Sequence, residues 1–198
     1  LHTYDLLGRP TSLTEPNSDV VTYTYNAQGG IETVSLQSPV SGLMSVVSAM
    51  AYNAAGQLTK LIYGNGVVSD YSYDPQTLRL ASSITQHPSS GVLQDFSYQF
   101  DRAGNVTALT DRVHTATQTF QYDELHRLTQ AIGAYGTSLY AYDPLGNMTE
   151  KEGRAMRYGE GGAGPHAVTS TSDGLQLVYD ANGNLIAKDF TQSPSHSV

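Results

Sequence analysis

An aromatic residue followed by aspartate or asparagine recurs eight times along this chain of 198 residues. A clear copy is Tyr142-Asp143-Pro144-Leu145-Gly146. The separations between copies are 21, 27, 21, 27, 22, 20 and 37 residues. A recurring period in this range is typical of repeat proteins, in which each copy folds as one supersecondary unit. The copies begin at Tyr4, Tyr25, Tyr52, Tyr73, Phe100, Tyr122, Tyr142 and Tyr179.

Each copy has the chemistry of a tight turn. The Asp or Asn can accept hydrogen bonds from backbone amides two residues further on. Glycine follows in six of the eight copies and permits a positive φ. His126 stands at the glycine position of the copy at Tyr122, so we expect either strain or another turn type there. The predicted structural anchors are Tyr4, Asp5, Gly8, Tyr25, Asn26, Gly29, Tyr52, Asn53, Gly56, Tyr73, Asp74, Phe100, Asp101, Gly104, Tyr122, Asp123, Tyr142, Asp143, Gly146, Tyr179, Asp180 and Gly183.

The residues before each anchor alternate in the manner of a strand, as in Tyr71-Ser72-Tyr73 and Leu177-Val178-Tyr179. Residues two apart lie on one face of a strand, so we expect ladders of aromatic rings that stack on each other. The sequence therefore predicts an all-β fold, an antiparallel ribbon of eight hairpins or roughly sixteen strands. We expect the repeats to fill residues 1–190, with a longer crossover at 153–174 and a polar tail at 191–198.

Composition excludes several classes of function. Only 14% of the residues are charged and the net charge is −8, with the ten Lys and Arg scattered. Binding to a nucleic acid needs clustered Lys and Arg, so we expect no nucleic-acid partner. There is no Cys and no apolar run of the length, about 18 residues, that spans a membrane. Because a repeat is already under way at Leu1, we expect the chain to be an excerpt from a longer protein.

Neither the aspartates nor the histidines predict catalysis. Asn replaces Asp at Asn26 and Asn53, so the shared role is hydrogen bonding rather than proton transfer. The six His lack metal-ligand spacing. The Gly159–Gly164 stretch lacks the Lys-Ser/Thr ending of a phosphate-binding loop. We therefore expect no catalytic residue, no cofactor and no metal, and hence no enzyme. A row of Ca²⁺ sites at the aspartates, and sugars stacked on exposed tyrosines, are the alternatives left open.

The unit Tyr-Asp-x-x-Gly-Asn/Arg/Gln-apolar-Thr resembles the YD repeat of the RHS family, over about residues 4–190. This family includes bacterial rearrangement-hotspot proteins, the B and C components of insecticidal toxin complexes, wall-associated proteins and teneurins. Gly64-Asn65-Gly66-Val67-Val68 and Gly164-Pro165-His166-Ala167-Val168 also look like bacterial members. The resemblance implies a β-ribbon that spirals into a hollow shell, which in bacterial members encloses a toxic C-terminal domain. The self-cleavage motif of some members is not found.

The resemblance implies a structural segment of a shell that encapsulates or delivers a toxin, in an exported bacterial protein that is secreted or on the cell surface. The expected partners are neighbouring repeats of a longer chain or a partner shell protein, and a C-terminal toxin cargo. A cell-surface module that binds glycans or a receptor is the alternative. Because 39% apolar residues cannot easily cover both faces of one curved sheet, we expect the segment to be completed by such neighbours.

Overall fold

The computed structural model describes residues 1–190, and the predicted polar tail at 191–198 lies outside the described residues. The described part is all β apart from one short 3₁₀ helix, η1 (Glu160–Gly162). It has 18 strands rather than the roughly sixteen expected from eight hairpins. The strands are β1 (His2–Tyr4), β2 (Pro10–Thr14), β3 (Val20–Tyr25), β4 (Ile31–Ser38), β5 (Gly42–Tyr52), β6 (Leu58–Tyr63), β7 (Val68–Tyr73), β8 (Leu80–His87), β9 (Gly91–Phe100), β10 (Val106–Asp111), β11 (Ala116–Tyr122), β12 (Leu128–Gly133), β13 (Gly136–Tyr142), β14 (Met148–Lys151), β15 (Arg154–Tyr158), β16 (Val168–Thr171), β17 (Leu175–Tyr179) and β18 (Leu185–Phe190).

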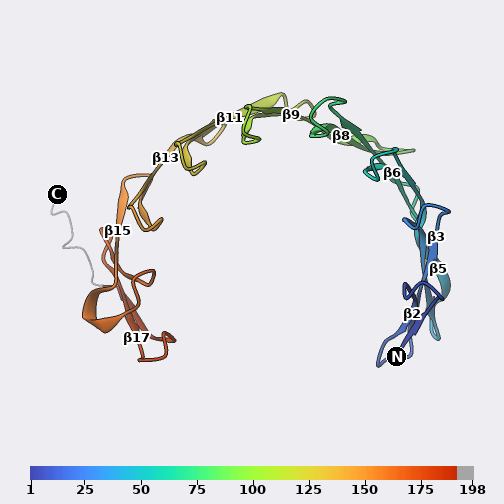
Figure 1. Cartoon of the computed structure of the whole chain (residues 1–198), viewed down its shortest axis with the longest axis horizontal. Helices are drawn as coiled ribbons and strands as arrows, with labels where there is room; N and C mark the ends of the chain where they lie inside the picture. Colours follow the sequence, from blue (N-terminus) through green and yellow to red (C-terminus); the bar gives the residue numbers. More distant parts are fainter. Residues whose placement is uncertain (191–198) are drawn as a thin grey trace. The chain divides into compact units, whose positions relative to one another are not determined.

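The strands follow one another in chain order within two compact units. The first unit comprises Leu1–Gln99 with Leu109–Thr117, and the second comprises Phe100–Ala108 with Gln118 onward. In the first unit, each strand from β1 to β9 pairs antiparallel with the next. The strands from β11 to β18 do the same in the second unit. Consecutive hairpins therefore lie side by side within each unit (Figure 1).

A β-bulge marks the strand end at almost every anchor tyrosine. At Tyr142 the register steps from Ala141↔Glu150 to Tyr142↔Met148, so that Thr149 is the extra residue. A bulge bends the strand and redirects the side chain next to it. The same step lies immediately before the anchors at Tyr4, Tyr25, Tyr52, Tyr73, Tyr122 and Tyr179.

Burial alternates along the strands, and the fully covered positions hold small side chains. In β11, Phe120 and Tyr122 are half-buried, whereas Thr119 and Gln121, which alternate with them, are exposed. Buried residues include Ala131 at 4% exposure and Ser69 at 2%, and the described residues contain no large side chain below 2%. One face of each unit thus carries the tyrosines, and the opposite face is open.

The segment at 153–174 is not the crossover that its missing Tyr-Asp pair predicted. It contains β15, η1 and β16, and β15 pairs with β16 through a bulge at Tyr158. The amide of Gly159 bonds to the carbonyl of Ala167 at 3.1 Å and closes the loop. A further repeat therefore lies here, with Gly159 in place of the Asp and a longer turn. None of the segments up to residue 190 forms a helix long and apolar enough to cross a membrane.

The stacked turns as the candidate functional site

Each anchor Asp or Asn holds its own turn closed through one side-chain oxygen. Asp123 Oδ1 accepts the backbone amides of Leu125 and Arg127, both at 2.9 Å. In the same way Asn26 Oδ1 accepts the amides of Gln28 and Gly30. Asparagine serves as well as aspartate because only an acceptor is needed. The side chains of Asp5, Asn53, Asp101, Asp143 and Asp180 likewise accept the backbone amide of the residue four positions later. Asp74 instead accepts the amides of Gln76 and Thr77.

The turns require a left-handed residue whether or not glycine is present. The φ angle of Gly146 is 89°, and its amide bonds to the carbonyl of Asp143 at 3.0 Å. His126 adopts φ 62° and makes the same bond to Asp123, which is the strained form of the two alternatives. In the longer turn at Asp74, Leu78 takes this position with φ 58°. Non-glycine residues pay a steric cost in this region, because Cβ approaches the backbone.

At the anchor aspartates other than Asp74, the second carboxylate oxygen bonds to the side chain four residues on. Arg127 Nε donates to Asp123 Oδ2 at 2.7 Å, and Asn147 Nδ2 donates to Asp143 Oδ2 at 2.8 Å. Where the anchor is Asn53, the direction reverses: Asn53 Nδ2 donates to Gln57 Oε1 at 2.9 Å. The side chain at the fourth position therefore donates to an aspartate anchor but accepts from Asn53. The carboxylate pairs also join Asp5 with Arg9, Asp101 with Asn105, and Asp180 with Asn184.

In the described part of the chain, seven tyrosines at strand ends join their turns to the repeat before them. The hydroxyl of Tyr142 donates to the backbone carbonyl of Leu128, the first residue of the preceding return strand, at 3.0 Å. The same bond recurs in both units and always ends on the first residue of a return strand. Its members are Tyr25 to Pro10, Tyr52 to Ile31, Tyr73 to Leu58, Tyr122 to Val106, Tyr158 to Met148 and Tyr179 to Val168.

At two anchors the tyrosine ring meets an arginine of the preceding turn, where we expected it to stack on another aromatic ring. The guanidinium of Arg9 lies 4.2 Å from the ring centroid of Tyr25, and that of Arg127 lies 4.7 Å from Tyr142. A stacked ring pair joins His2 and Tyr4. The hydroxyl and the ring of these tyrosines both face the preceding turn. The arginine of that turn therefore lies over the ring and occupies the place of another aromatic side chain.

Side chains at the same fourth position also connect neighbouring turns directly. Arg127 Nη1 donates to the carbonyl of Asp143 at 3.1 Å, and Gln57 Nε2 donates to that of Leu78 at 2.6 Å. Asn105 Nδ2 lies 3.0 Å from His126 Nδ1. These side chains each serve two turns, since they hold their own anchor and reach the next. Asn147 does the same through Pro165 and His166.

Electrostatics fixes the anchors as acceptors and the tyrosines as donors. The side-chain hydrogen bond from Arg127 lowers the pKa of Asp123, and those from Asn105 and Asn184 lower the pKa of Asp101 and Asp180. Burial raises the pKa of Tyr142 and Tyr158. At neutral pH the carboxylates are therefore ionised and the phenols protonated, which suits permanent hydrogen bonds and not proton transfer. Within residues 1–190, no group of three His, Cys, Asp or Glu is arranged to hold a metal ion.

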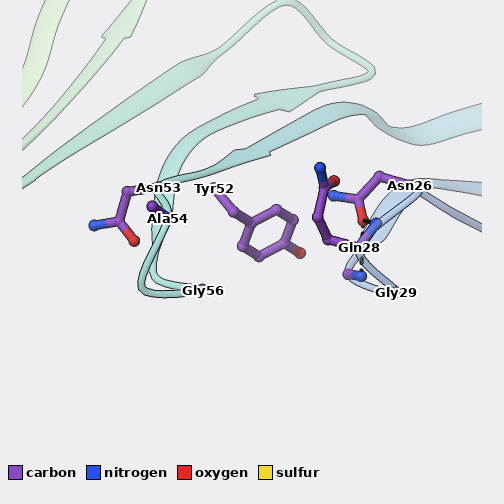
Figure 2. A pocket seen from close by; sticks show the side chains of 8 residues that line it. Asn26, Gln28, Gly29, Tyr52, Asn53, Ala54 and Gly56 are labelled. Atoms are coloured by element: carbon purple, nitrogen blue, oxygen red, sulfur yellow. Dashed lines mark hydrogen bonds between the residues drawn. The ribbon is translucent and has the colours of Figure 1, made fainter.

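An open pocket of about 490 Å³ lies between the turns that begin at Asn26 and Asn53 (Figure 2). Its lining residues are uncharged, and they include Gln28, Gly30 and Tyr52. Gly30 lies four residues after the anchor Asn26. At this position every other anchor except Asp74 is followed by Arg, Gln or Asn. A Cβ on Gly30 would lie only 2.9 Å from Cε2 of the Tyr52 ring. The pocket thus marks a junction between turns that no bridging side chain fills.

Two of these features were missed by reading the sequence. Tyr158 was not identified as an anchor because Gly159 follows it, although it lies 16 residues after Tyr142 and 21 before Tyr179. The alternation of apolar and polar residues in Met156-Arg157-Tyr158 could have indicated that a strand ends at Tyr158. The pocket depends on how two turns face each other, and only the unusual Gly29-Gly30 pair pointed to it.

Comparison with known proteins matches the RHS Repeat family over residues 4–35, 52–87 and 100–138, more than half of the chain. Toxin subunit YenC1 of Yersinia entomophaga is 29% identical over 144 residues, which are 65% of this chain and 15% of that protein. Toxin subunit YenC2 of the same organism is 32% identical over 103 residues, 44% of this chain and 11% of that protein. The chain therefore spans a small part of the length of these relatives.

Solved structures show the same fold. A crystal structure of TcdB2-TccC3 superposes with a TM-score of 0.76 at 21% identity, over 100% of this chain and 13% of that one. A structure of the Photorhabdus luminescens Tc holotoxin pore gives a TM-score of 0.76 at 21% identity, over 100% of this chain and 12% of that one. With the family match over most of the repeats and the turns built on Tyr-Asp and Tyr-Asn pairs, the chain belongs to the RHS repeat family.

Proposed function

We propose that this chain is a structural segment of the wall of an RHS-repeat shell, which encapsulates or delivers a C-terminal toxin domain in an exported bacterial protein. Its role is mechanical and not enzymatic. The supporting relatives are toxin subunits, and the structural neighbours are complexes of TcdB2 with TccC3.

The observation that carries this proposal is the tyrosine bond between successive repeats. Tyr122, Tyr142, Tyr158 and Tyr179 tie four consecutive turns to the strands before them in the second unit. Arg127 and Asn147 add side-chain bonds from turn to turn. Such nearest-neighbour bonds stabilise a wall of repeats of any length, because each unit needs only the one beside it.

The open faces of the sheet support a place inside a larger assembly. Leu139, Val178 and Ile186 are 51%, 49% and 63% exposed, although they lie in β13, β17 and β18. The apolar side chains of a sheet normally lie on a face that is covered by other parts of the protein or by a partner. We propose that neighbouring repeats, a partner shell protein or the toxin cargo covers them in the intact protein.

Protease protection in the intact protein tests the proposal. The wild-type shell should protect the C-terminal domain from a protease that cleaves it once it is released. A Tyr122→Ala/Tyr142→Ala variant, which loses two bonds between repeats, should expose that domain and increase its rate of cleavage. Leu145→Ala is the matched control, because Leu145 is 66% exposed at the tip of the same turn. Equal cleavage of the C-terminal domain in the wild type and the double variant would contradict an enclosing wall.

A further inference from the structure

Two of the four methionines lie two residues before a tyrosine that joins successive repeats. Met50 precedes Tyr52 in β5, and Met156 precedes Tyr158 in β15. Residues two apart lie on one face of a strand, so each methionine is on the same side of the sheet as its tyrosine. Each methionine is therefore placed beside a hydroxyl that makes a bond between repeats.

The sulfur of Met50 is in contact with the hydroxyl of Tyr52. The hydroxyl oxygen lies 3.3 Å from Met50 Sδ and 2.8 Å from the carbonyl oxygen of Ile31. A phenol has one proton to donate and a thioether is a weak acceptor, so the carbonyl receives the hydrogen bond. The bond between these repeats thus depends on the sulfur remaining the weaker of the two acceptors.

The second pair repeats this arrangement beside an open pocket. The hydroxyl of Tyr158 donates to the carbonyl of Met148 at 2.7 Å and lies 4.0 Å from Met156 Sδ. Met148 and Met156 line a pocket of about 290 Å³. Met50 and Met156 are both half-buried rather than enclosed. A molecule as small as hydrogen peroxide can therefore reach either sulfur.

We infer that Met50 and Met156 are oxidation sites, through which a peroxide loosens the junctions between repeats. A lone pair of Sδ attacks one oxygen of hydrogen peroxide, and the O–O bond breaks as the S–O bond forms. The other oxygen leaves as hydroxide, takes the proton of the transferred oxygen and becomes water. The sulfur loses the two electrons that the peroxide gains, and the product is methionine sulfoxide.

The sulfoxide reverses the order of the two acceptors. Its oxygen is a strong acceptor, and it is attached to the atom that already lies beside the tyrosine hydroxyl. The proton of Tyr52 then turns from the carbonyl of Ile31 to the sulfoxide. The tyrosine remains hydrogen-bonded, but within its own strand, and the bond to the preceding repeat is lost.

Hydrogen–deuterium exchange of the intact protein before and after treatment with hydrogen peroxide tests the inference, with peptide mass spectrometry to identify the methionines that gain oxygen. Oxidation of Met50 should raise exchange in β4 and β5 by about two- to tenfold, the effect of losing one hydrogen bond. Oxidation of Met156 should do the same in β14 and β15. Methionine sulfoxide reductases should restore the original exchange.

Substitutions in β5 separate the site from general oxidative damage. Met50→Leu removes the sulfur and should abolish the response of β4 and β5. Met44→Leu is the matched control, because Met44 is 47% exposed in the same strand and makes no bond to a tyrosine hydroxyl within residues 1–190. It should leave the response in place. Tyr52→Phe lacks the hydroxyl, so its exchange should be raised before treatment and peroxide should add little.

Three results would each overturn the inference. The first is that Met50 stays unoxidised while Met44 is oxidised, and the second is that Met50 is oxidised without a change in exchange. The third is an equal peroxide response of wild type and either Met50→Leu or Tyr52→Phe. Because the assay measures local opening and not protection of a cargo, its failure would leave the proposed shell untouched.

Discussion

The hydroxyl of Tyr142 donates a hydrogen bond to the backbone carbonyl of Leu128, with 3.0 Å between the two oxygen atoms. This bond leaves one repeat and ends on the first residue of the return strand of the repeat before it. Tyr140 lies two positions earlier on the same strand, and its hydroxyl has no hydrogen-bond partner among residues 1–190. The two tyrosines therefore allow the bond to be tested separately from the ring.

Tyr142→Phe should destabilise the junction between these repeats by about 1 kcal/mol, the usual net value of one hydrogen bond. Hydrogen–deuterium exchange of peptides covering β12 and β13 in the intact protein measures this loss locally. Tyr140→Phe is the control and should leave exchange unchanged. Equal exchange in Tyr142→Phe and the wild type would show that the bond contributes nothing to cohesion between repeats.

The pairing between each anchor and its fourth residue can be tested by exchanging one natural pair for another. Asp123→Asn should be destabilising, because it removes the carboxylate that Arg127 binds at 2.7 Å. Adding Arg127→Gln recreates the pair formed by Asn53 and Gln57 and should restore part of the lost stability. The measurement is a double-mutant cycle on local exchange. Additive losses would mean that the two side chains do not stabilise each other.

Leu78→Gly should stabilise its turn by up to about 1 kcal/mol, because glycine removes the strain of a left-handed leucine but adds freedom to the unfolded chain. Leu78 has φ 58° and its side chain is 51% exposed, so little packing is lost. Leu125→Gly is the control at a turn position without positive φ, and it should be destabilising. Exchange of the turn amides reports both changes, and a loss of protection in Leu78→Gly would contradict strain at this position.

Acid should weaken the wall through its turn carboxylates. Hydrogen bonds from Arg127, Asn105 and Asn184 lower the pKa of Asp123, Asp101 and Asp180 in the folded chain. The unfolded chain, with an Asp pKa of about 3.9, therefore takes up protons first as the pH falls. The stabilisation is complete above about pH 5 and is lost as the pH falls through the folded-state pKa values.

Urea unfolding midpoints from about pH 7 to about pH 3 measure this loss. Asp180→Asn keeps an acceptor at the turn but removes one titrating group, so it should flatten the decline. A midpoint that stays constant down to about pH 3 would show that the carboxylates contribute no pH-dependent stability.

Much of this architecture can be predicted from the sequence because it is local. The pair Tyr142-Asp143 and the glycine after it specify a turn within five residues, and alternation specifies the strand before it. The acceptor of each tyrosine cannot be read in the same way, since it depends on the register between two repeats. Nor does the alternation reveal that Arg9 and Arg127 cover tyrosine rings. These contacts arise from the bulges, which redirect side chains toward the preceding turn.

Tyr158 tests whether the tyrosine bond between repeats depends on the chemistry of the turn, because the turn after Tyr158 has no Asp. Its hydroxyl donates to the carbonyl of Met148 at 2.7 Å, and burial raises its pKa as it does for Tyr142. If the bond between repeats acts independently of the turn chemistry, Tyr158→Phe should cost about 1 kcal/mol, as Tyr142→Phe does. Local exchange of β14 and β15 in the intact protein measures this cost, with Tyr140→Phe in β13, whose hydroxyl has no hydrogen-bond partner among residues 1–190, as a control. Unchanged protection in Tyr158→Phe would mean that the bond stabilises a junction only when an Asp or Asn closes the turn behind it.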